Sequence, residues 1–288
     1  MRTDPDTVLD RRPATGGLRF GISTPGGAAA AAERAATAAA VGAIPELVLW
    51  FTDFAAAAPD AELTAVTGAT PIITWEPWLA LGAGRYDRSA FPLTAIAAGA
   101  EDDHVRAWAR ALAPHRAGLR FAHEFNGDWY PWSGDPECYV RAWRRLHGLI
   151  AAEAPGVRWI WSPNAPFAQV PAAWYPGDEY VDVVGLDGYN WGTARPGGRW
   201  VRPAELFGPA LAALRELGKP VLVTEVGCAE AGGSKPAWIT ELVALLTADP
   251  AVAGFVWFDH DKETDWRLCS SPAAARAMAA ALDQEARP

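Results

Sequence analysis

The chain has 288 residues and a mass of 30.7 kDa, and 50% of its residues are hydrophobic. This is enough for one α/β domain of about 250 residues. The net charge of −9 argues against a nucleic-acid partner, whose phosphates require a basic face. No run of 18 apolar residues indicates a membrane span. We therefore expect a globular protein with a neutral ligand and without nucleic-acid or membrane partners.

The first 17 residues, MRTDPDTVLDRRPATGG, are polar and lack the apolar segment of a secretory signal. We expect residues 1–17 to be flexible and residues 18–288 to form one domain. Two alternatives for localisation stay open, a cytoplasmic protein or a secreted one whose signal is absent from this sequence.

Apolar segments of strand length alternate with helical patterns along the chain. The predicted strands are Leu18–Ser23, Leu47–Phe51, Pro71–Trp75, Gly118–His123, Val157–Ser162, Val181–Asp187, Pro220–Glu225 and Gly254–Asp259. The predicted helices are Ala29–Ala40, Ala61–Thr67, Asp103–Pro114, Pro136–Ala152, Pro203–Leu217, Pro236–Ala248 and Pro272–Gln284. Only the connection after Ser162 lacks a long helical pattern. Eight such units predict a single-domain (β/α)8 TIM barrel, and no G-x-G-x-x-G follows the first strand to favour a doubly wound sheet.

Polar and aromatic residues gather where seven of the eight predicted strands end. Active sites of (β/α)8 barrels lie at this end of the strands. The residues are Trp50, Thr52 and Asp53; Trp75, Glu76 and Trp78; His123 and Glu124; Trp161 and Asn164; Asp187, Tyr189 and Asn190; Glu225; and Trp257 and Asp259. We expect them to form one site.

The segment from Arg120 to Trp132, RFAHEFNGDWYPW, places acidic and aromatic residues close together. The chain also has 15 Trp against 10 Phe and 6 Tyr. Sugar rings stack on flat aromatic faces, and aromatic contacts contribute on the order of 1 kcal/mol each beyond the area they bury. The pattern therefore favours a carbohydrate site.

Two glutamates follow the fourth and seventh predicted strands. Because side chains alternate along a strand, Ala122 and Glu124 would share one face, as would Val223 and Glu225. Both carboxyl groups are then expected to point into the barrel mouth. A pair of carboxyl groups flanking a sugar bond is the machinery of glycoside hydrolysis.

The segments HEFNGDWYPW and VTEVG together resemble the signature of glycoside hydrolase family 26. The resemblance extends over most of the chain, through LWFTDF, WSPN, YPGDEYVDVVGLDGYN and FVWFD. It implies a retaining, endo-acting (β/α)8 hydrolase of a β-linked polysaccharide, with β-1,4-mannan first and mixed-linkage β-glucan or β-1,3-xylan as alternatives. Retention requires carboxyl groups about 5–5.5 Å apart. Secretion is also favoured by this resemblance.

The resemblance also implies roles for individual residues. Glu124 matches the acid/base, Glu225 the nucleophile and Tyr189 the tyrosine that donates to the nucleophile. The subsite for the scissile sugar is matched by His123, Trp129 and Trp257. Further substrate-binding candidates are Asn126, Trp75, Trp78, Trp132, Trp161, Trp174, Trp191 and Trp200.

Two other classes of function remain open. A non-catalytic carbohydrate-binding barrel would keep the tryptophans but lose a carboxylate. A metal-dependent hydrolase would need clustered ligands, and the five histidines form no H-x-H pair. We expect a monomer with no metal and no cofactor. Three cysteines fit neither a disulfide scaffold nor a zinc site, although they permit a bridge between Cys228 and Cys269.

Overall fold

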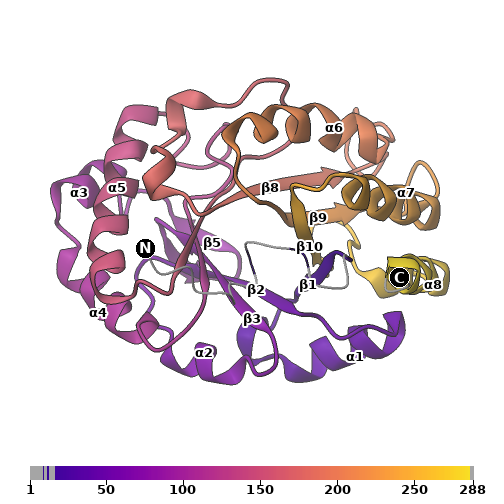
Figure 1. Cartoon of the computed structure of the whole chain (residues 1–288), viewed down its shortest axis with the longest axis horizontal. Helices are drawn as coiled ribbons and strands as arrows, with labels where there is room; N and C mark the ends of the chain where they lie inside the picture. Colours follow the sequence, from indigo (N-terminus) through magenta and orange to yellow (C-terminus); the bar gives the residue numbers. More distant parts are fainter. Residues whose placement is uncertain (1–8, 10–11, 13–16, 286–288) are drawn as a thin grey trace.

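A computed structural model describes residues 9, 12 and 17–285 of the chain. Eight parallel strands close into a barrel in the order β1-β10-β9-β8-β7-β6-β3-β2. They are β1 (Arg19–Ser23), β2 (Leu47–Asp53), β3 (Thr70–Glu76), β6 (Gly118–Phe121), β7 (Arg158–Trp161), β8 (Val183–Asn190), β9 (Val221–Cys228) and β10 (Val252–Phe258). Figure 1 shows the helices arranged around these strands. The predicted (β/α)8 barrel is confirmed.

Helices cover the outside of the barrel. They are α1 (Ala31–Val41), α2 (Asp60–Ala65), α3 (Leu93–Ala98), α4 (Asp102–Leu112), α5 (Pro136–Glu153), α6 (Pro203–Leu214), α7 (Lys235–Ala248) and α8 (Pro272–Glu285). Asp135 caps α5 by accepting from the backbone N–H of Cys138 at 2.9 Å, and proline occupies the first turn of α5, α6 and α7. Both features are typical helix starts.

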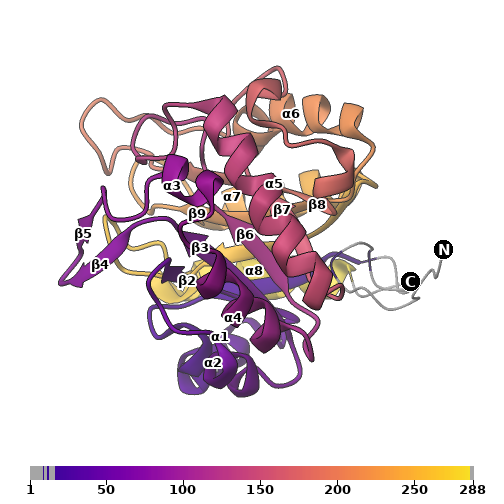
Figure 2. The ribbon, with the colours of Figure 1, turned by 90° about the vertical axis from the view of Figure 1, so that its left-hand side faces the viewer.

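The sequence analysis missed two elements between β3 and β6, the short helix α3 and a β-hairpin. The hairpin pairs β4 (Leu79–Gly82) with β5 (Arg85–Asp87) in antiparallel fashion. Its turn runs through Gly82, Ala83 and Gly84, all with positive φ, a conformation that glycine adopts readily. Figure 2 shows the hairpin projecting from the body of the molecule at the left. After β7, the described connection contains only the 3-10 helices η2 (Ala172–Trp174) and η3 (Asp178–Tyr180), as the missing helical pattern predicted.

The strands bury different side chains on their two faces. Inside the barrel, seven strand residues pack with Leu9: Leu47, Leu49, Ile72, Ile160, Val183, Leu222 and Val256. The outward faces and the helices form a much larger core that is rich in tryptophan. This period of two decides which residues can reach the barrel mouth.

Three further expectations concern the chain as a whole. Most of the segment 1–17, predicted to be flexible, lies outside the described residues. Cys138, Cys228 and Cys269 are all free thiols, so the bridge between Cys228 and Cys269 is not formed. Among the helices described, none has the length and apolar character needed to cross a bilayer.

Candidate active site

A cleft of about 1030 Å³ opens at the carboxyl ends of the strands. Three of the glutamates that line it are buried: Glu76 on β3, Glu124 after β6 and Glu225 on β9. Each comes from a different strand of the closed barrel. The fold therefore brings together three carboxyl groups that lie far apart in sequence.

Glu225 reaches the cleft through an irregularity in β9. In the pairing of β9 with β8, Leu222 lies opposite Gly185 and Glu225 lies opposite Asp187, so β9 has one extra residue between these two pairs. Leu222 lies inside the barrel, whereas Val223 packs in the outer core. The prediction that Val223 and Glu225 share a face is thus wrong. The bulge turns Glu225 inward, as bulges near active sites commonly do.

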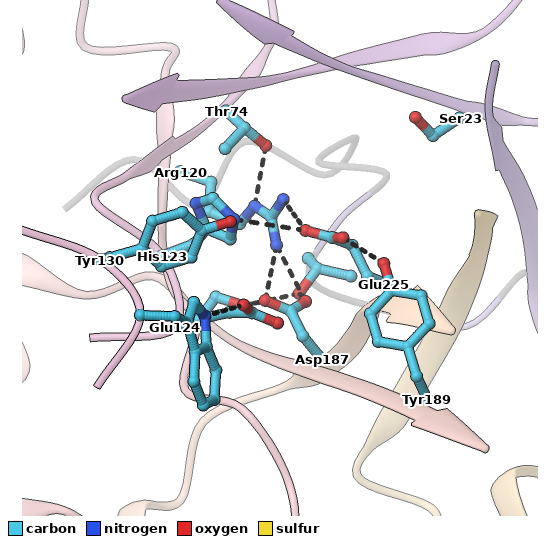
Figure 3. Close-up of polar contacts among 12 residues, drawn as sticks. Ser23, Thr74, Arg120, His123, Glu124, Tyr130, Asp187, Tyr189 and Glu225 are labelled. Carbon is cyan, nitrogen blue, oxygen red and sulfur yellow. Dashed lines mark hydrogen bonds and ion pairs between the residues drawn. The ribbon is translucent and has the colours of Figure 1, made fainter. Parts of the chain in front are cut away.

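Two donors hold the carboxylate of Glu225 (Figure 3). The phenol of Tyr189, on β8, donates to its Oε2 at 2.5 Å, and the guanidinium of Arg120, on β6, donates to its Oε1. Burial, followed by the charge of Glu225, raises the pKa of Tyr189 well above its usual value. Tyr189 is therefore a neutral donor, and both contacts favour the ionised form of the carboxyl group.

Arg120 lies in a polar layer inside the barrel, beneath the cleft. It is fully buried, and its Nη1 donates to both oxygens of Asp187 at 2.8 and 2.7 Å, while its Nε donates to Thr74 at 2.9 Å. The hydroxyl of Thr224 donates to Asp187 at 2.7 Å. Charge-assisted, bidentate contacts of this kind fix the guanidinium in place. The sequence analysis missed Arg120, although a charged residue within a predicted barrel strand was a usable signal.

Glu124 lies beyond the end of its strand. β6 ends at Phe121, and both Ala122 and Glu124 have positive φ, at 46° and 51°. The alternation predicted to carry over from Ala122 to Glu124 therefore does not apply. Instead, the backbone N–H of Glu124 donates to the carbonyl of Ser162 at 2.8 Å, which ties this turn to the end of β7. Left-handed backbone at non-glycine residues is uncommon and occurs often at functional sites.

The carboxyl group of Glu124 has a less polar environment than that of Glu225. Its Oε2 accepts one hydrogen bond, from the indole N–H of Trp129 at 2.8 Å. Burial, followed by the negative charges of Glu225 and Asp187, raises the pKa of Glu124 well above its usual value. This environment therefore favours the protonated form of Glu124, as a general acid requires.

His123 lies directly behind the nucleophile candidate. Its Nε2 is 3.7 Å from Oε1 of Glu225 and 3.1 Å from the hydroxyl of Tyr130. Burial, followed by the charge of Arg120, lowers the pKa of His123 well below its usual value. The imidazole is thus neutral, and it supports the site from beneath because only 1% of its surface is exposed.

Five of the predicted aromatic residues line the cleft: Trp50, Trp78, Trp129, Tyr189 and Trp191. Trp129 is 44% exposed, which leaves a ring face free for a ligand. Tyr86, at the β-hairpin, stacks on Trp78 at 4.1 Å and extends the aromatic wall. The cleft therefore offers the flat surfaces that sugar rings bind.

Three predicted sugar contacts, Trp75, Trp161 and Trp257, point away from the cleft. They alternate with the inward residues Ile72, Ile160 and Val256, and all three belong to the outer core. Trp75, for example, lies between Phe54 at 4.3 Å and Trp108 at 4.2 Å. These three predictions are wrong, because the alternation of side chains along each strand turns these tryptophans to the outer face. On β10 the inward aromatic residue is Phe258, which does line the cleft.

Four other candidates also lie outside the cleft lining. Trp132 is 1% exposed, stacks on Tyr130 and donates to the carbonyl of His123 at 2.7 Å, so it supports the site from behind. Asn126 bonds both the N–H and the carbonyl of Asn164, at 2.8 and 2.9 Å, and so joins two loops. Trp174 and Trp200 pack against the outer core. Their side chains are already occupied by protein contacts.

The third buried glutamate, Glu76, was noted only as a residue at a strand end. It shares the inward face of β3 with Ile72 and Thr74 and lines the cleft. Burial, followed by the charge of Glu225, raises the pKa of Glu76 to about 8. Within the described residues, no group of three His, Cys, Asp or Glu side chains is arranged to hold a metal ion.

Comparisons with known proteins relate the chain to glycoside hydrolases. The family model of glycosyl hydrolase family 26 matches residues 100–236. Endoglucanase H of Acetivibrio thermocellus is 34% identical over 254 residues, which cover 83% of this chain and 27% of that protein. Mannan endo-1,4-beta-mannosidase A and B of Caldalkalibacillus mannanilyticus is 30% identical over 83 residues, or 25% of this chain and 16% of that protein. The chain thus spans about a quarter of the length of endoglucanase H.

Solved structures share the fold. A β-mannanase from Bacteroides ovatus aligns with a TM-score of 0.64 at 17% identity, covering 94% of this chain and 89% of that one. An endo-beta-mannanase/endo-beta-glucanase from Prevotella bryantii aligns with a TM-score of 0.65 at 15% identity, covering 91% of this chain and 43% of that one. At these identities, the likeness shows a common barrel.

Proposed function

The chain belongs to glycoside hydrolase family 26, and on this premise we propose that it hydrolyses a β-linked polysaccharide by retaining double displacement. The observation that carries the proposal is the contrast between two buried carboxyl groups in one cleft. Glu225 accepts hydrogen bonds from a guanidinium and a phenol, whereas burial raises the pKa of Glu124 and favours its protonated form. Environments that push two carboxyl groups toward opposite protonation states identify the acid and the base of a reaction.

In the first step, Glu225 attacks the anomeric carbon. A covalent bond forms between its carboxylate oxygen and the sugar while the bond to the glycosidic oxygen breaks. Glu124 gives its proton to that leaving oxygen, and the freed chain departs. Arg120 and Tyr189 donate hydrogen bonds to the carboxylate of the nucleophile and fix its orientation.

In the second step, water replaces the enzyme on the sugar. Glu124, now a carboxylate, takes a proton from the water as it attacks the anomeric carbon, and Glu225 is released. The indole of Trp129 donates to Glu124 throughout and favours this ionised form. The exposed face of Trp129 and the Trp78–Tyr86 pair would hold neighbouring sugar rings of the chain.

We propose β-1,4-mannan as the substrate, because the curated mannosidase relative and the Bacteroides ovatus neighbour are both named for mannan cleavage. A β-glucan is the second candidate, since endoglucanase H matches 83% of the chain. Both substrates are long chains with neutral sugars, which suit an open cleft with aromatic walls. Endo action and activity as a monomer belong to the same proposal.

The test is a product assay on mannan, mixed-linkage β-glucan, β-1,3-xylan and laminarin, with the first-formed anomer resolved by NMR. We expect release of β-configured oligosaccharides from mannan, with full activity in EDTA. An α-configured first product would reject retention, and loss of activity in EDTA would favour a metal-dependent mechanism. Binding of these glycans without any cleavage would instead support the alternative of a non-catalytic carbohydrate-binding barrel.

A further inference from the structure

The mechanism above leaves one buried carboxyl group of the cleft without a role. Glu76 ends β3 on its inward face and is 7% exposed, and the side chain lines the same cavity as Glu124 and Glu225. Its position at the barrel mouth follows from the alternation of side chains along a strand. Ile72, four residues before Glu76 on the same face of β3, lies in the barrel interior. A strand end that presents a carboxyl group to a cleft is a place for recognition or chemistry.

No ion pair satisfies Glu76 among the residues that the structure describes. Lys262 lines the same cleft, but its ammonium pairs with Glu263 at 3.0 Å. Arg120 lowers the pKa of Glu76 only in part, since its guanidinium bonds Asp187, Thr74 and Glu225. Burial and the charge of Glu225 prevail and raise the pKa to about 8.

We propose that Glu76 is a substrate-binding residue that donates a hydrogen bond, as a neutral carboxylic acid, to a hydroxyl of the sugar held at Glu225. Its second oxygen accepts from an adjacent hydroxyl of the same ring. This inference rests on the proposed hydrolase function and adds to it a residue that selects the substrate.

Both the protonation and the position of Glu76 suit this role. A buried carboxyl group that no ion pair satisfies keeps hydrogen-bonding capacity for a ligand, and a site built this way rejects ligands that lack the matching hydroxyl. A neutral acid can donate as well as accept, which a carboxylate cannot do. The carboxylate of Glu225 also lies in this cleft, so a sugar that carries its own carboxylate would be repelled. The recognised substrate is therefore a neutral glycan.

The inference has a consequence for pH dependence. Below pH 8, Glu76 keeps its proton and the proposed hydrogen bond is available. Above pH 8, the group ionises, the donor is lost and a second negative charge arises beside Glu225. KM is therefore expected to rise above pH 8. The groups that face Glu76 from other elements are Glu225, Arg120, Lys262 and Trp78. Arg120, Lys262 and Trp78 favour its ionised form, but burial and the charge of Glu225 outweigh them and raise the pKa.

The first experiment compares Glu76→Ala and Glu76→Gln with wild type in steady-state kinetics on the hydrolysed glycan. Loss of one hydrogen bond predicts about a tenfold rise in KM for Glu76→Ala. Glu76→Gln keeps a neutral donor and acceptor, so its KM should stay within about threefold of wild type and should no longer rise above pH 8. Glu153→Gln, at the exposed end of α5, is the matched control and should leave the kinetics unchanged. A wild-type KM in Glu76→Ala, or a rise in KM above pH 8 that persists in Glu76→Gln, overturns the inference.

A second experiment does not depend on turnover. Calorimetry with mannotetraose and cellotetraose compares Glu124→Gln with Glu124→Gln/Glu76→Ala. Weaker binding by the double variant supports the inference, whereas equal binding, or no binding by either variant, overturns it. Infrared difference spectra at pH 7 should show a protonated carboxyl band in wild type that Glu76→Gln lacks, and a carboxylate band there would contradict the neutral acid. If wild type cleaves no glycan but these two results hold, the proposed hydrolase function fails and the binding role stands.

Discussion

The hydrogen-bond donors of Glu225 and of Glu124 come from different kinds of structural element. Glu225 lies at a bulge within the barrel strand β9, and its donors Arg120 and Tyr189 come from two other strands. Glu124 sits on a left-handed turn past the end of β6, and its donor Trp129 comes from the same loop. The nucleophile candidate is thus fixed by the barrel itself, and the acid candidate by a local loop whose main effect is burial.

This difference shows how one residue type serves two roles. Charged and phenolic donors stabilise a carboxylate, whereas burial with a single indole donor keeps a carboxyl group protonated. Variants that remove one of these hydrogen-bond donors or carboxyl groups at a time test this difference.

Removal of the nucleophile should have the largest effect. Glu225→Ala is expected to lower kcat on the glycan by roughly 10⁴-fold or more, because no other group can form the covalent bond. With an activated aryl glycoside, added azide should restore turnover and give the α-glycosyl azide. Formation of the β-azide, or near-normal activity, would reverse the assignment of the two glutamates. Glu225→Gln serves to compare thermal stability, since its amide oxygen can still accept from Arg120.

Replacement of the acid should cost less and depend on the leaving group. Glu124→Gln is expected to lower kcat/KM on polysaccharide by about 10²–10⁴-fold. Glycosylation by an aryl glycoside with an acidic phenol needs little proton donation, so a burst of phenol should persist. The alkaline limb of the pH profile should also change, because the raised pKa of Glu124 contributes to it in wild type. An equal loss on both substrates would argue against general acid catalysis.

Loss of the buried cation should affect both stability and activity. Arg120→Met leaves Asp187 and Glu225 without their shared guanidinium, and breaking a buried ion pair typically costs about 3–5 kcal/mol. Chemical denaturation should show this loss at neutral pH. A variant as stable as wild type would mean that the polar layer contributes little to folding.

The phenol contact should contribute a smaller share. Tyr189→Phe removes a hydrogen bond to a charged group while it keeps the ring that lines the cleft. Such a bond contributes about 1.5–3 kcal/mol, so kcat should fall by roughly 10- to 100-fold with little change in KM. A rise in KM alone would instead make Tyr189 a binding residue.

The smallest effect is expected from removal of the hydrogen bond that Glu124 accepts from Trp129. Trp129→Phe removes the indole donor that lowers the pKa of Glu124. The pKa of Glu124 should rise further, and the alkaline limb of kcat/KM should move to higher pH, because the acid keeps its proton longer. The second step, hydrolysis of the glycosyl-enzyme, should slow by about threefold to tenfold, because the carboxylate of Glu124 loses a hydrogen bond. A limb that moves to lower pH would contradict the role of the indole.

Much of the fold and part of the site could be predicted from the sequence. The barrel followed from eight apolar segments and the helical patterns between them, since both periods are local properties of the chain. The glutamates at the fourth and seventh strands were found from composition at strand ends and from a family resemblance. The same period of two would also have placed Trp75, Trp161 and Trp257 on the outer face, had it been applied strand by strand.

Other features depend on contacts between distant residues. The bulge in β9 and the left-handed turn at Glu124 follow from pairing with neighbouring strands and loops, which no local pattern records. Lys235 illustrates this further: it begins α7, yet it is fully buried and donates to the carbonyls of Trp266 and Arg267 at 3.1 and 2.7 Å.

Local sequence patterns therefore predicted the order of the eight barrel strands and of most helices, together with the acidic and aromatic groups at the strand ends. Which of those groups face the cleft, and which protonation states they favour, depends on the folded barrel. The physical reason is that burial and the distance to other charges set the pKa of a carboxyl group, and both arise when strands far apart in sequence close into one barrel.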